Sequence, residues 1–169
     1  MGQNQRSQIV MSDAEITEFI EQSRMVTMAT VGPSGFPHLV AMWYGVIDGK
    51  IYFETKAKSQ KVANLRRDPK IACMIEAGDS YDQLRGVSIE GTAAIIDDTN
   101  DDEYWACAQS VFDRYNDAPA DGSDVRPILE FMMNKRVVVR IDPERVRSWD
   151  HRKLGQPQMP VGGTTAKYL

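Results

Sequence analysis

Tight turns separate the apolar segments of this chain at short intervals, and this pattern limits the fold more than any other feature. The pair Asp48-Gly49 stands between two β-rich segments and is a strong signal for a two-residue hairpin. A second turn, Gly32-Pro33-Ser34-Gly35, stands one segment earlier. Strands joined by such turns pair antiparallel, so we predict a mainly β, α+β fold. Because strand edges must be hidden, the sheet is expected to curl into a barrel.

Six segments have the composition of strands and end at turn signals. They cover residues 25–31, 39–47, 50–54, 70–76, 85–96 and 136–141, the last extending toward 146. Gly91 interrupts the fifth segment, which predicts a bulge or a sharp bend. The Asp48-Gly49 hairpin is expected to place residues 41–44 beside residues 51–53.

Helical segments are expected around this sheet. Ser12 and Glu15 form a capping box, which predicts a helix over residues 13–22. A short helix should follow the third strand and end at Asp68-Pro69.

The stretch between the fifth and sixth strands has helical spacing and predicts two more helices. Thr99 is the candidate cap of the first, and Ser123 is the candidate cap of the second, which should end near Asn134. Pro127 then falls in an opening turn, where proline is tolerated.

The chain has 169 residues, of which 42% are hydrophobic and 26% charged, an ordinary globular balance. One domain is expected over residues 11–154, with a flexible leader at 1–10 and a tail at 155–169. The net charge of −4 argues against a general nucleic-acid-binding protein, which needs a basic surface. No segment resembles a membrane span or an apolar signal core, so a cytoplasmic protein is expected.

Cysteines and histidines are few. Cys73 and Cys107 lie in apolar segments far from any paired spacing, so we predict two buried, reduced thiols, with a disulfide as the less favoured alternative. The scattered positions give no credible zinc site, and no metal is expected.

Lysines crowd the start of the helix predicted after the third strand. Lys56, Lys58 and Lys61 stand where a helix N-terminus, with its partial positive charge, favours acidic side chains. If Ser59 is the N-cap and its hydroxyl accepts one N–H, the other amides and the ammonium groups converge on one point. That arrangement is an anion site suited to phosphate. Three solvated lysines on a loop are the alternative, and the motif alone leaves both open.

Aromatic side chains on the neighbouring strands favour the anion site. Trp43, Tyr44 and Tyr52 make an aromatic β surface beside the lysine-rich turn, which suits a flat, phosphorylated heterocycle. Taken singly, Trp43 and Tyr52 are equally well explained as core residues.

The segment PHLVAMWYGVIDGKIYFETKAKSQKVANLRRDPKIA, residues 37–72, resembles the pyridoxamine-phosphate-oxidase-like family of flavin-binding split β-barrels. In that family, Thr-x3-Ser-x-Lys leads from a strand into a helix, here at Thr55, Ser59 and Lys61. LRGVSIEGTA and SWDHRKLG resemble two later family segments, in the same order along the chain. The resemblance implies an antiparallel split β-barrel of six or more strands with peripheral helices, in a homodimer whose cofactor groove lies between subunits.

The basic residues depart from those of the FMN-dependent oxidases. The resemblance implies that those enzymes hold the FMN phosphate with an Arg and a Lys on the second strand and an Arg-Lys pair at the helix start. The corresponding residues here are Leu39, Tyr44, Gln60 and Lys61. NLRRDP, residues 64–69, is typical of the branch that uses the deazaflavin coenzyme F420. F420 is therefore the expected cofactor and FMN the alternative.

The resemblance implies an oxidoreductase that transfers a hydride from reduced F420 to an unsaturated or quinone-like small molecule. No acid–base dyad is needed; His151 and Tyr44 are candidate proton donors, and His38 is expected to be exposed without a role. The residues implied at the cofactor are Val40, Met42, Trp43, Thr55, Lys58, Ser59, Gln60, Lys61, Arg85, Trp149 and Arg152.

Arg66 and Arg67 could add to a basic surface for the acidic tail of F420 or form a solvated helix end. A non-catalytic flavin or haem binder is the alternative from another class of protein. Its axial haem ligand would come from His38, His151, Cys73 or Cys107.

Overall fold

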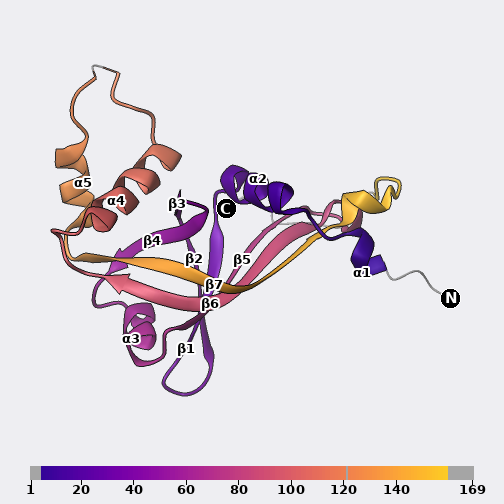
Figure 1. Cartoon of the computed structure of the whole chain (residues 1–169), viewed down its shortest axis with the longest axis horizontal. Helices are drawn as coiled ribbons and strands as arrows, with labels where there is room; N and C mark the ends of the chain where they lie inside the picture. The colour runs from indigo at the N-terminus through magenta and orange to yellow at the C-terminus, as the bar shows by residue number, and fades with distance from the viewer. Residues whose placement is uncertain (1–4, 121, 160–169) are drawn as a thin grey trace.

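A computed structural model describes residues 5–120 and 122–159, and in that part of the chain seven strands form one curled antiparallel sheet (Figure 1). The strands lie in the order β2-β1-β5-β6-β7-β4-β3. Their bounds are β1 Val26–Val31, β2 Pro37–Met42, β3 Gly45–Ile47, β4 Lys50–Lys56, β5 Lys70–Ala77, β6 Arg85–Ile96 and β7 Arg136–Asp150. The prediction of an antiparallel α+β fold is confirmed.

Five α-helices and two short 3₁₀ helices accompany the sheet within the described ranges. They are α1 Gln5–Gln8, α2 Asp13–Gln22, α3 Gln60–Arg67, α4 Asp102–Tyr115, α5 Arg126–Met133, η1 Tyr81–Gln83 and η2 His151–Leu154. In Figure 1, α4 and α5 lie together at one end of the sheet and α1 lies at the other. The capping box of α2 is confirmed, because the Ser12 hydroxyl accepts the Glu15 N–H and the Glu15 carboxylate accepts the Ser12 N–H.

The hairpin at Asp48-Gly49 is confirmed, but its first strand is shorter than predicted. The two turn residues have φ values of 50° and 74°, as a type I′ turn requires, and they join β3 to β4. Residues 39–47 are not one strand, because β2 ends at Met42 and pairs with β1. The expected pairing of residues 41–44 with residues 51–53 is therefore wrong, and β3 takes that place.

Trp43 and Tyr44 interrupt the chain between β2 and β3 for a physical reason. The ring of Tyr44 turns into the core and is fully buried. Its hydroxyl donates to the Ile20 carbonyl at 2.6 Å, and its backbone N–H donates to the Tyr115 hydroxyl at 3.0 Å. Side-chain partners thus replace the strand pairing that the sequence pattern predicts at these two residues.

β6 and β7 are the long strands of the sheet, and their pairing is irregular where the sequence predicts it. The register shifts at Glu90/Gly91, so the bulge is confirmed. A Cβ atom at Gly91 would lie 2.2 Å from the Asp142 carbonyl oxygen, too close for any side chain. β7 runs on to Asp150, past its predicted end, because Pro143 lies opposite the bulge, where a strand tolerates proline.

Two predicted helix starts are corrected. α4 is capped by Asp101 rather than Thr99, and the Asp101 carboxylate accepts an N–H of the first turn at 2.8 Å. α5 begins after Val125, two residues beyond Ser123. Several polar residues precede each helix and each could act as its cap, so the sequence pattern locates the first residue of the helix only to within a few residues.

The core has two parts, one on each face of the sheet, because side chains alternate along a strand. Phe53 and Cys73 belong to the cluster inside the curl. Tyr52 and Cys107 belong to the cluster beneath α4 and α5. Both cysteines are buried free thiols, as predicted.

Within the expected flexible leader, residues 5–8 form α1 and the next residues bond to the fold. The Ile9 carbonyl accepts the Asp150 N–H at 2.7 Å. Residues 1–4 of the leader and 160–169 of the tail lie outside the described residues. Within the described ranges, none of the helices has the length and apolarity to cross a membrane.

Candidate functional site

The lysine-rich turn joins β4 to α3 and leaves the start of the helix open. α3 follows Ser59, whose backbone is extended with φ −73° and ψ 154°. The N–H groups of residues 60–62 precede any carbonyl to which they could donate within the helix. The predicted cap is wrong in one respect: the Ser59 hydroxyl makes no capping bond, and its oxygen is buried without a hydrogen-bond partner among the described residues. Such a hydroxyl beside unpaired N–H groups is a donor set for an anion.

Lys61 is the lysine that the fold holds at this point. Its ammonium group donates to Thr55 Oγ1 at 3.1 Å, and Thr55 is buried on the inner face of β4. Burial, followed by the positive charge of Arg136, lowers the pKa of Lys61. Lys56 turns away to donate to a carbonyl at the end of α5 at 3.2 Å, and Lys58 is exposed. A bound anion would stabilise the charged form of Lys61, because an opposite charge nearby favours ionisation.

Arg136, the first residue of β7, is a cation near this site that the sequence analysis missed, and its positive charge contributes to the lowered pKa of Lys61. Its Nη1 atom lies 3.6 Å from Oε1 of Glu54, a carboxyl whose side chain is only 11% exposed. Arg136 Nε and Glu54 Oε2 are both buried without partners in the described part of the chain. The available signal was the pair Lys135-Arg136 before an apolar strand. In the sequence alone, this pair cannot be distinguished from the ordinary start of a strand. Only the pairing of β7 with β4 places Arg136 beside Lys56.

Burial raises the pKa of Glu54, and the charges of Arg136 and Lys56 offset only part of this effect. A carboxyl with a raised folded pKa favours the folded state while protonated, and this contribution is lost as the pH rises through that pKa. We expect Glu54→Gln to raise the free energy of unfolding at about pH 8 by about 1.4 kcal/mol per unit of pKa shift, with no change near pH 4. Urea unfolding at the two pH values measures this difference. A variant less stable than wild type at the higher pH would show that the ionised pair with Arg136 stabilises the fold.

Side-chain hydrogen bonds tie α3 to the first two strands. The Gln60 amide donates to Asn64 Oδ1 at 2.8 Å, and the Asn64 amide donates to Thr30 Oγ1 at 3.0 Å. His38 lies opposite Thr30 in the register of β1 and β2. Its ring is partly buried, with Nδ1 unpartnered within the described ranges, so the expectation of a simply exposed His38 is wrong. Gln60 likewise has a structural bond that the sequence did not indicate.

The predicted site residues on and after β2 do not all face one way. Val40 and Met42 are partly buried against the core inside the curl. Trp43 is 53% exposed and stacks on Tyr115, with ring centroids 4.4 Å apart and planes 4° apart. β2 ends at Met42, one residue before Trp43, so at roughly 3.3 Å per residue Trp43 lies on the order of 17 Å along the chain from His38. The fold therefore separates Trp43 from the start of α3.

The side chain of Tyr44 is enclosed by its neighbours in the core. The Arg114 guanidinium lies 4.6 Å from the centre of its ring, and the hydroxyl donates to the Ile20 carbonyl. Burial raises the pKa of Tyr44 to about 12. The expectation that Tyr44 donates a proton to a ligand conflicts with this placement.

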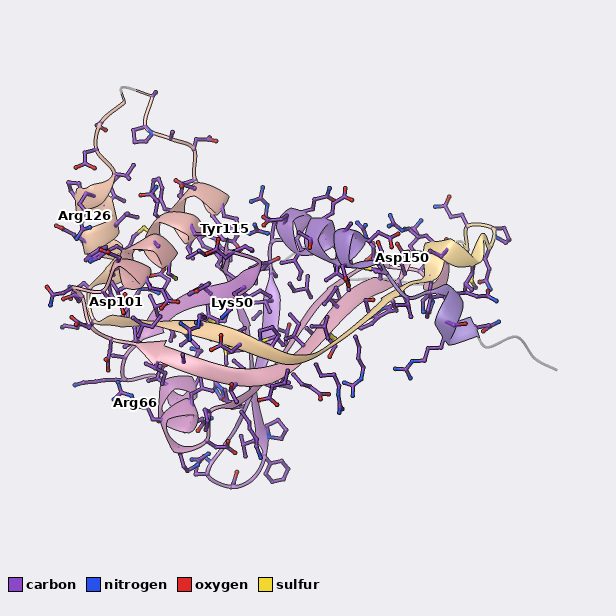
Figure 2. The ribbon with its side chains drawn as sticks, viewed as in Figure 1. Lys50, Arg66, Asp101, Tyr115, Arg126 and Asp150 are labelled. Atoms are coloured by element: carbon purple, nitrogen blue, oxygen red, sulfur yellow. The ribbon has the colours of Figure 1, made fainter. Side chains whose placement is uncertain are left out.

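Arg85, Trp149 and Arg152 gather at the far end of the long strands. In Figure 2 their neighbour Asp150 lies far along the sheet from Arg66 of α3. α3 lies near the other end of β6, which has 12 residues. At about 3.3 Å per residue this strand spans on the order of 35 to 40 Å. One copy of the chain therefore does not bring these three residues to Lys61.

These far residues also lie on two faces of the sheet. Arg85 lies opposite Asp150 in register, and the buried Asp150 carboxylate accepts two bonds from the Arg152 guanidinium at 2.6 and 2.9 Å. The hydrogen bonds from Arg152 lower the pKa of Asp150. Trp149 faces the other side, where its indole covers Gly86 so closely that a Cβ atom there would lie 2.3 Å from the ring.

The thiols are poor candidates for ligating a metal or a haem. Burial raises the pKa of Cys73 to about 12 and also raises the pKa of Cys107. Both side chains lie in the two core clusters. Across residues 5–120 and 122–159, no group of three or more His, Cys, Asp and Glu side chains is placed to hold a metal ion.

Comparisons with known proteins point to one family. The family model described as pyridoxamine 5'-phosphate oxidase matches residues 12–150. A curated relative, the pyridoxine/pyridoxamine 5'-phosphate oxidase of Bacteroides thetaiotaomicron, is 32% identical over 87 residues. That alignment covers 51% of this chain and 39% of the relative, so this chain matches well under half of that oxidase.

Solved structures share the fold. A conserved hypothetical protein of Mycobacterium tuberculosis is 54% identical, with a TM-score of 0.86, over 95% of this chain and 98% of its own. A protein named F420 reductase is 25% identical, with a TM-score of 0.53, over 76% of this chain and 93% of its own.

Proposed function

This chain belongs to the pyridoxamine 5'-phosphate oxidase family, and from that premise we propose that it is an F420-dependent oxidoreductase. The proposed reaction transfers a hydride from reduced F420, a deazaflavin, to an unsaturated or quinone-like small molecule. The likeness to a protein named F420 reductase supports the choice of cofactor.

The distribution of cations is the observation that carries this proposal. Lys61, with Arg136 nearby, supplies a single basic site at the start of α3, whereas β2 contains no Lys or Arg. Where the FMN oxidases are implied to carry basic residues, Leu39 is 64% exposed and Tyr44 is fully buried. A phosphomonoester such as that of FMN carries a charge of about −1.5 to −2 and calls for several cations. The singly charged phosphodiester of F420 needs fewer.

The residues around α3 fit the proposed cofactor. Lys61, oriented by Thr55, would hold the phosphodiester together with the Ser59 hydroxyl and the N–H groups of the first turn. Exposed Lys58 would face the acidic tail. When bound, the reduced cofactor supplies a hydride. The protein's part is to orient donor and acceptor and to exclude water.

The arginines at the end of α3 are already engaged. Arg66 forms an exposed ion pair with Asp97 at 3.1 Å, and Arg67 donates to the Val31 carbonyl. An exposed ion pair contributes little, so Arg66 is free to exchange Asp97 for a carboxylate of the cofactor tail. The bond of Arg67 to the backbone favours a structural role.

A second copy of the chain belongs to the proposal, because one copy separates Lys61 from Arg85 and Arg152. The outward side chains of β1, β2 and β5 offer an exposed surface for such a partner. Exposed small or apolar residues on this surface are Leu39, Ala41, Ala72 and Met74. An apolar face of this kind marks an interaction surface. In the proposed homodimer, the far ends of β6 and β7 reach the start of α3 in the other copy.

Titration of the purified, cofactor-free protein with F420, FMN and haem separates the candidates. We expect F420 to bind in the micromolar range or tighter, as read from its fluorescence, and FMN to bind more weakly. Tight FMN binding with no response to F420 would instead favour an FMN-dependent oxidoreductase on the same fold. A haem spectrum with an axial ligand and no flavin binding would favour a haem carrier.

Turnover is tested by following the absorbance of the cofactor while enones and quinones are screened as acceptors. Oxidation of reduced F420 in the presence of one acceptor class supports the proposed reaction. Binding of F420 with no turnover across both classes would contradict the enzymatic part and favour a non-catalytic cofactor store.

A further inference from the structure

A pocket of about 360 Å³ lies at the end of the sheet that α4 and α5 cover (Figure 1). It forms between the first turn of α4, the last turn of α5 and the first residue of β7. Its lining includes Tyr104, Trp105, Glu130, Met133, Lys135 and Arg136. The pocket therefore joins an indole and a thioether to two adjacent cationic side chains.

This pocket is separate from the anion site at the start of α3. Val138 of β7 packs into the core cluster beneath α4 and α5. Arg136 stands two residues before Val138, and because side chains alternate along a strand, it faces the same way. In Figure 1, α4 and α5 lie on one side of β6 and β7, whereas α3 lies on the other. The charge of Arg136 is felt at Lys61, but its side chain lines the pocket on the opposite face.

The guanidinium group of Arg136 makes no hydrogen bond to the described residues. Its Nε atom is buried without a partner there, and Nη1 lies 3.6 Å from the Glu54 carboxylate, beyond the usual bond length of about 2.7 to 3.2 Å. Arg140, four residues further along the same face, instead donates to Glu103 at 2.9 Å and to Asp142 at 3.0 Å. Buried donors are nearly always paired in folded proteins, so Arg136 is placed to receive an acceptor from a ligand.

Hydrogen bonds hold the walls of the pocket in place. The Tyr104 hydroxyl lies 3.3 Å from the carbonyl oxygen of the last residue of α5 and 3.2 Å from that of Arg136. The Trp105 indole N–H donates to the Thr99 carbonyl at 2.7 Å. The guanidinium carbon of Arg126 lies 3.5 Å from the centre of the Trp105 ring. The walls are therefore preformed in the described part of the chain.

Lys135 brings its ammonium group to the pocket from an unusual backbone conformation. Its φ of 59° lies in the left-handed region, which glycine adopts without strain and other L residues adopt rarely. Its carbonyl accepts the Ala57 N–H at 2.9 Å, which ties this conformation to the turn after β4. A glycine would satisfy the backbone here better than lysine does, so the lysine side chain is best explained by a role at the pocket.

We propose that this pocket binds a small organic carboxylate that carries a flat apolar ring. The guanidinium group of Arg136 presents a fork of N–H donors that matches the two oxygens of a carboxylate. Lys135 adds a second positive charge beside it, and the indole of Trp105 suits the ring of the ligand.

The acidic residues around the pocket favour a single negative charge on the ligand. Glu54 lies beside Arg136, and Glu130 lines the pocket, where it also pairs with Arg126 at 3.0 Å. A phosphate monoester carries a charge of about −1.5 to −2 and would be repelled more strongly by both carboxylates than a carboxylate ligand would. The pocket therefore differs in ligand class from the phosphate site proposed at α3.

Nuclear magnetic resonance of protein labelled with ¹⁵N-tryptophan tests the location, because the chain contains three tryptophans. Cinnamate, a flat aromatic carboxylate, is the probe, and Trp105→Phe assigns the Trp105 signal. We expect cinnamate to shift the Trp105 signal, with a Kd of about 1 mM or tighter, and to leave those of Trp43 and Trp149 unchanged. No shift at Trp105, or an equal shift of all three signals, would overturn the proposal.

Cinnamamide, the uncharged analogue of the probe, tests whether the carboxylate is recognised. It keeps the flat ring and loses the charge, so its Kd should be at least about tenfold higher than that of cinnamate. Equal Kd values for the two compounds would contradict an anion site at Arg136 and Lys135.

Lys135→Gly removes the ammonium group without harm to the backbone, so the variant should unfold at a temperature no lower than wild type. We expect its Kd for cinnamate to rise about three- to tenfold. Lys61→Ala is the matched control and should leave this Kd within a factor of about two. An unchanged Kd in Lys135→Gly would contradict the proposal. An equal loss in Lys61→Ala would place the carboxylate at the lysine-rich turn and overturn it.

Arg136→Lys separates the fork of donors from the charge. The lysine keeps a cation beside Glu54, so the fold is expected to be retained, but it cannot bond both oxygens of a carboxylate in the same plane. The Kd for cinnamate should rise about tenfold, and wild-type affinity in this variant would contradict recognition by the guanidinium group. These titrations use the cofactor-free protein, so their outcome does not depend on whether F420 binds.

Discussion

Lys61→Ala is expected to weaken F420 binding about 10- to 100-fold, because a charge-assisted hydrogen bond contributes about 1.5 to 3 kcal/mol. Lys61 is the one lysine of the turn that the fold directs to the helix start, through its bond to Thr55. Fluorescence titration of the purified variant measures the change in Kd.

Lys56→Ala is the matched control for this experiment. Lys56 stands in the same turn, but its ammonium group donates to the Asn134 carbonyl. Its removal should leave the F420 affinity within a factor of about two, because an exposed charge away from the ligand contributes little. If Lys56→Ala weakened binding as much as Lys61→Ala, the anion would be held by the general charge of the turn rather than by one directed ammonium.

The thermal stability of the cofactor-free Lys61→Ala protein is a second measurement on the same variant. Burial lowers the pKa of Lys61, which means that the folded protein without a bound anion disfavours the charged form of this side chain. The cofactor-free Lys61→Ala protein should therefore unfold at a temperature no lower than wild type. A large loss of thermal stability would mean that the bond to Thr55 serves the fold, and weaker F420 binding would then follow from local unfolding.

Mixed dimers of Lys61→Ala and Arg85→Ala chains are expected to regain tight F420 sites that neither variant has alone. In the proposed homodimer each site takes Lys61 from one copy and Arg85 from the other. Random pairing makes half of the dimers mixed, and each mixed dimer has one intact site and one doubly altered site. About a quarter of the wild-type number of sites should therefore return on co-expression.

Two different affinity tags allow the mixed dimer to be purified and titrated. One tight site per mixed dimer supports a groove shared between copies, while a dimer made of two differently tagged Lys61→Ala chains should show none. A mixed dimer without any tight site, or a wild-type protein that stays monomeric in solution, would contradict the shared site.

Local sequence signals predicted the elements that depend on neighbouring residues. The capping box of α2 and the Asp48-Gly49 turn were confirmed because each is built within four residues. The bulge at Gly91 was confirmed because a glycine inside a strand marks a close backbone approach, here to Asp142. In the candidate site, the junction that holds Thr55 and Lys61 is local in the same sense, since the two residues are six positions apart in the sequence.

Other parts of the site depend on residues far apart in the chain. Arg136 reaches the lysine-rich turn because β7 pairs with β4, and His38 meets Thr30 because β2 pairs with β1. Trp43 and Tyr44 looked like two members of one strand surface, yet one is exposed and the other is buried. A sequence pattern does not show which aromatic ring the core will take, because that choice depends on the space between α2 and α4.

The sequence by itself determined the antiparallel sheet, its tight turns and a cationic start for α3, because backbone preferences and short-range spacing decide these features. Only the tertiary structure decided that Arg85 and Arg152 lie far from Lys61 and that Trp149 faces the other side of the sheet. The length of β6 and β7 sets that distance, and the alternation of side chains along a strand sets that face. Both effects appear only when the register between distant strands is fixed by packing.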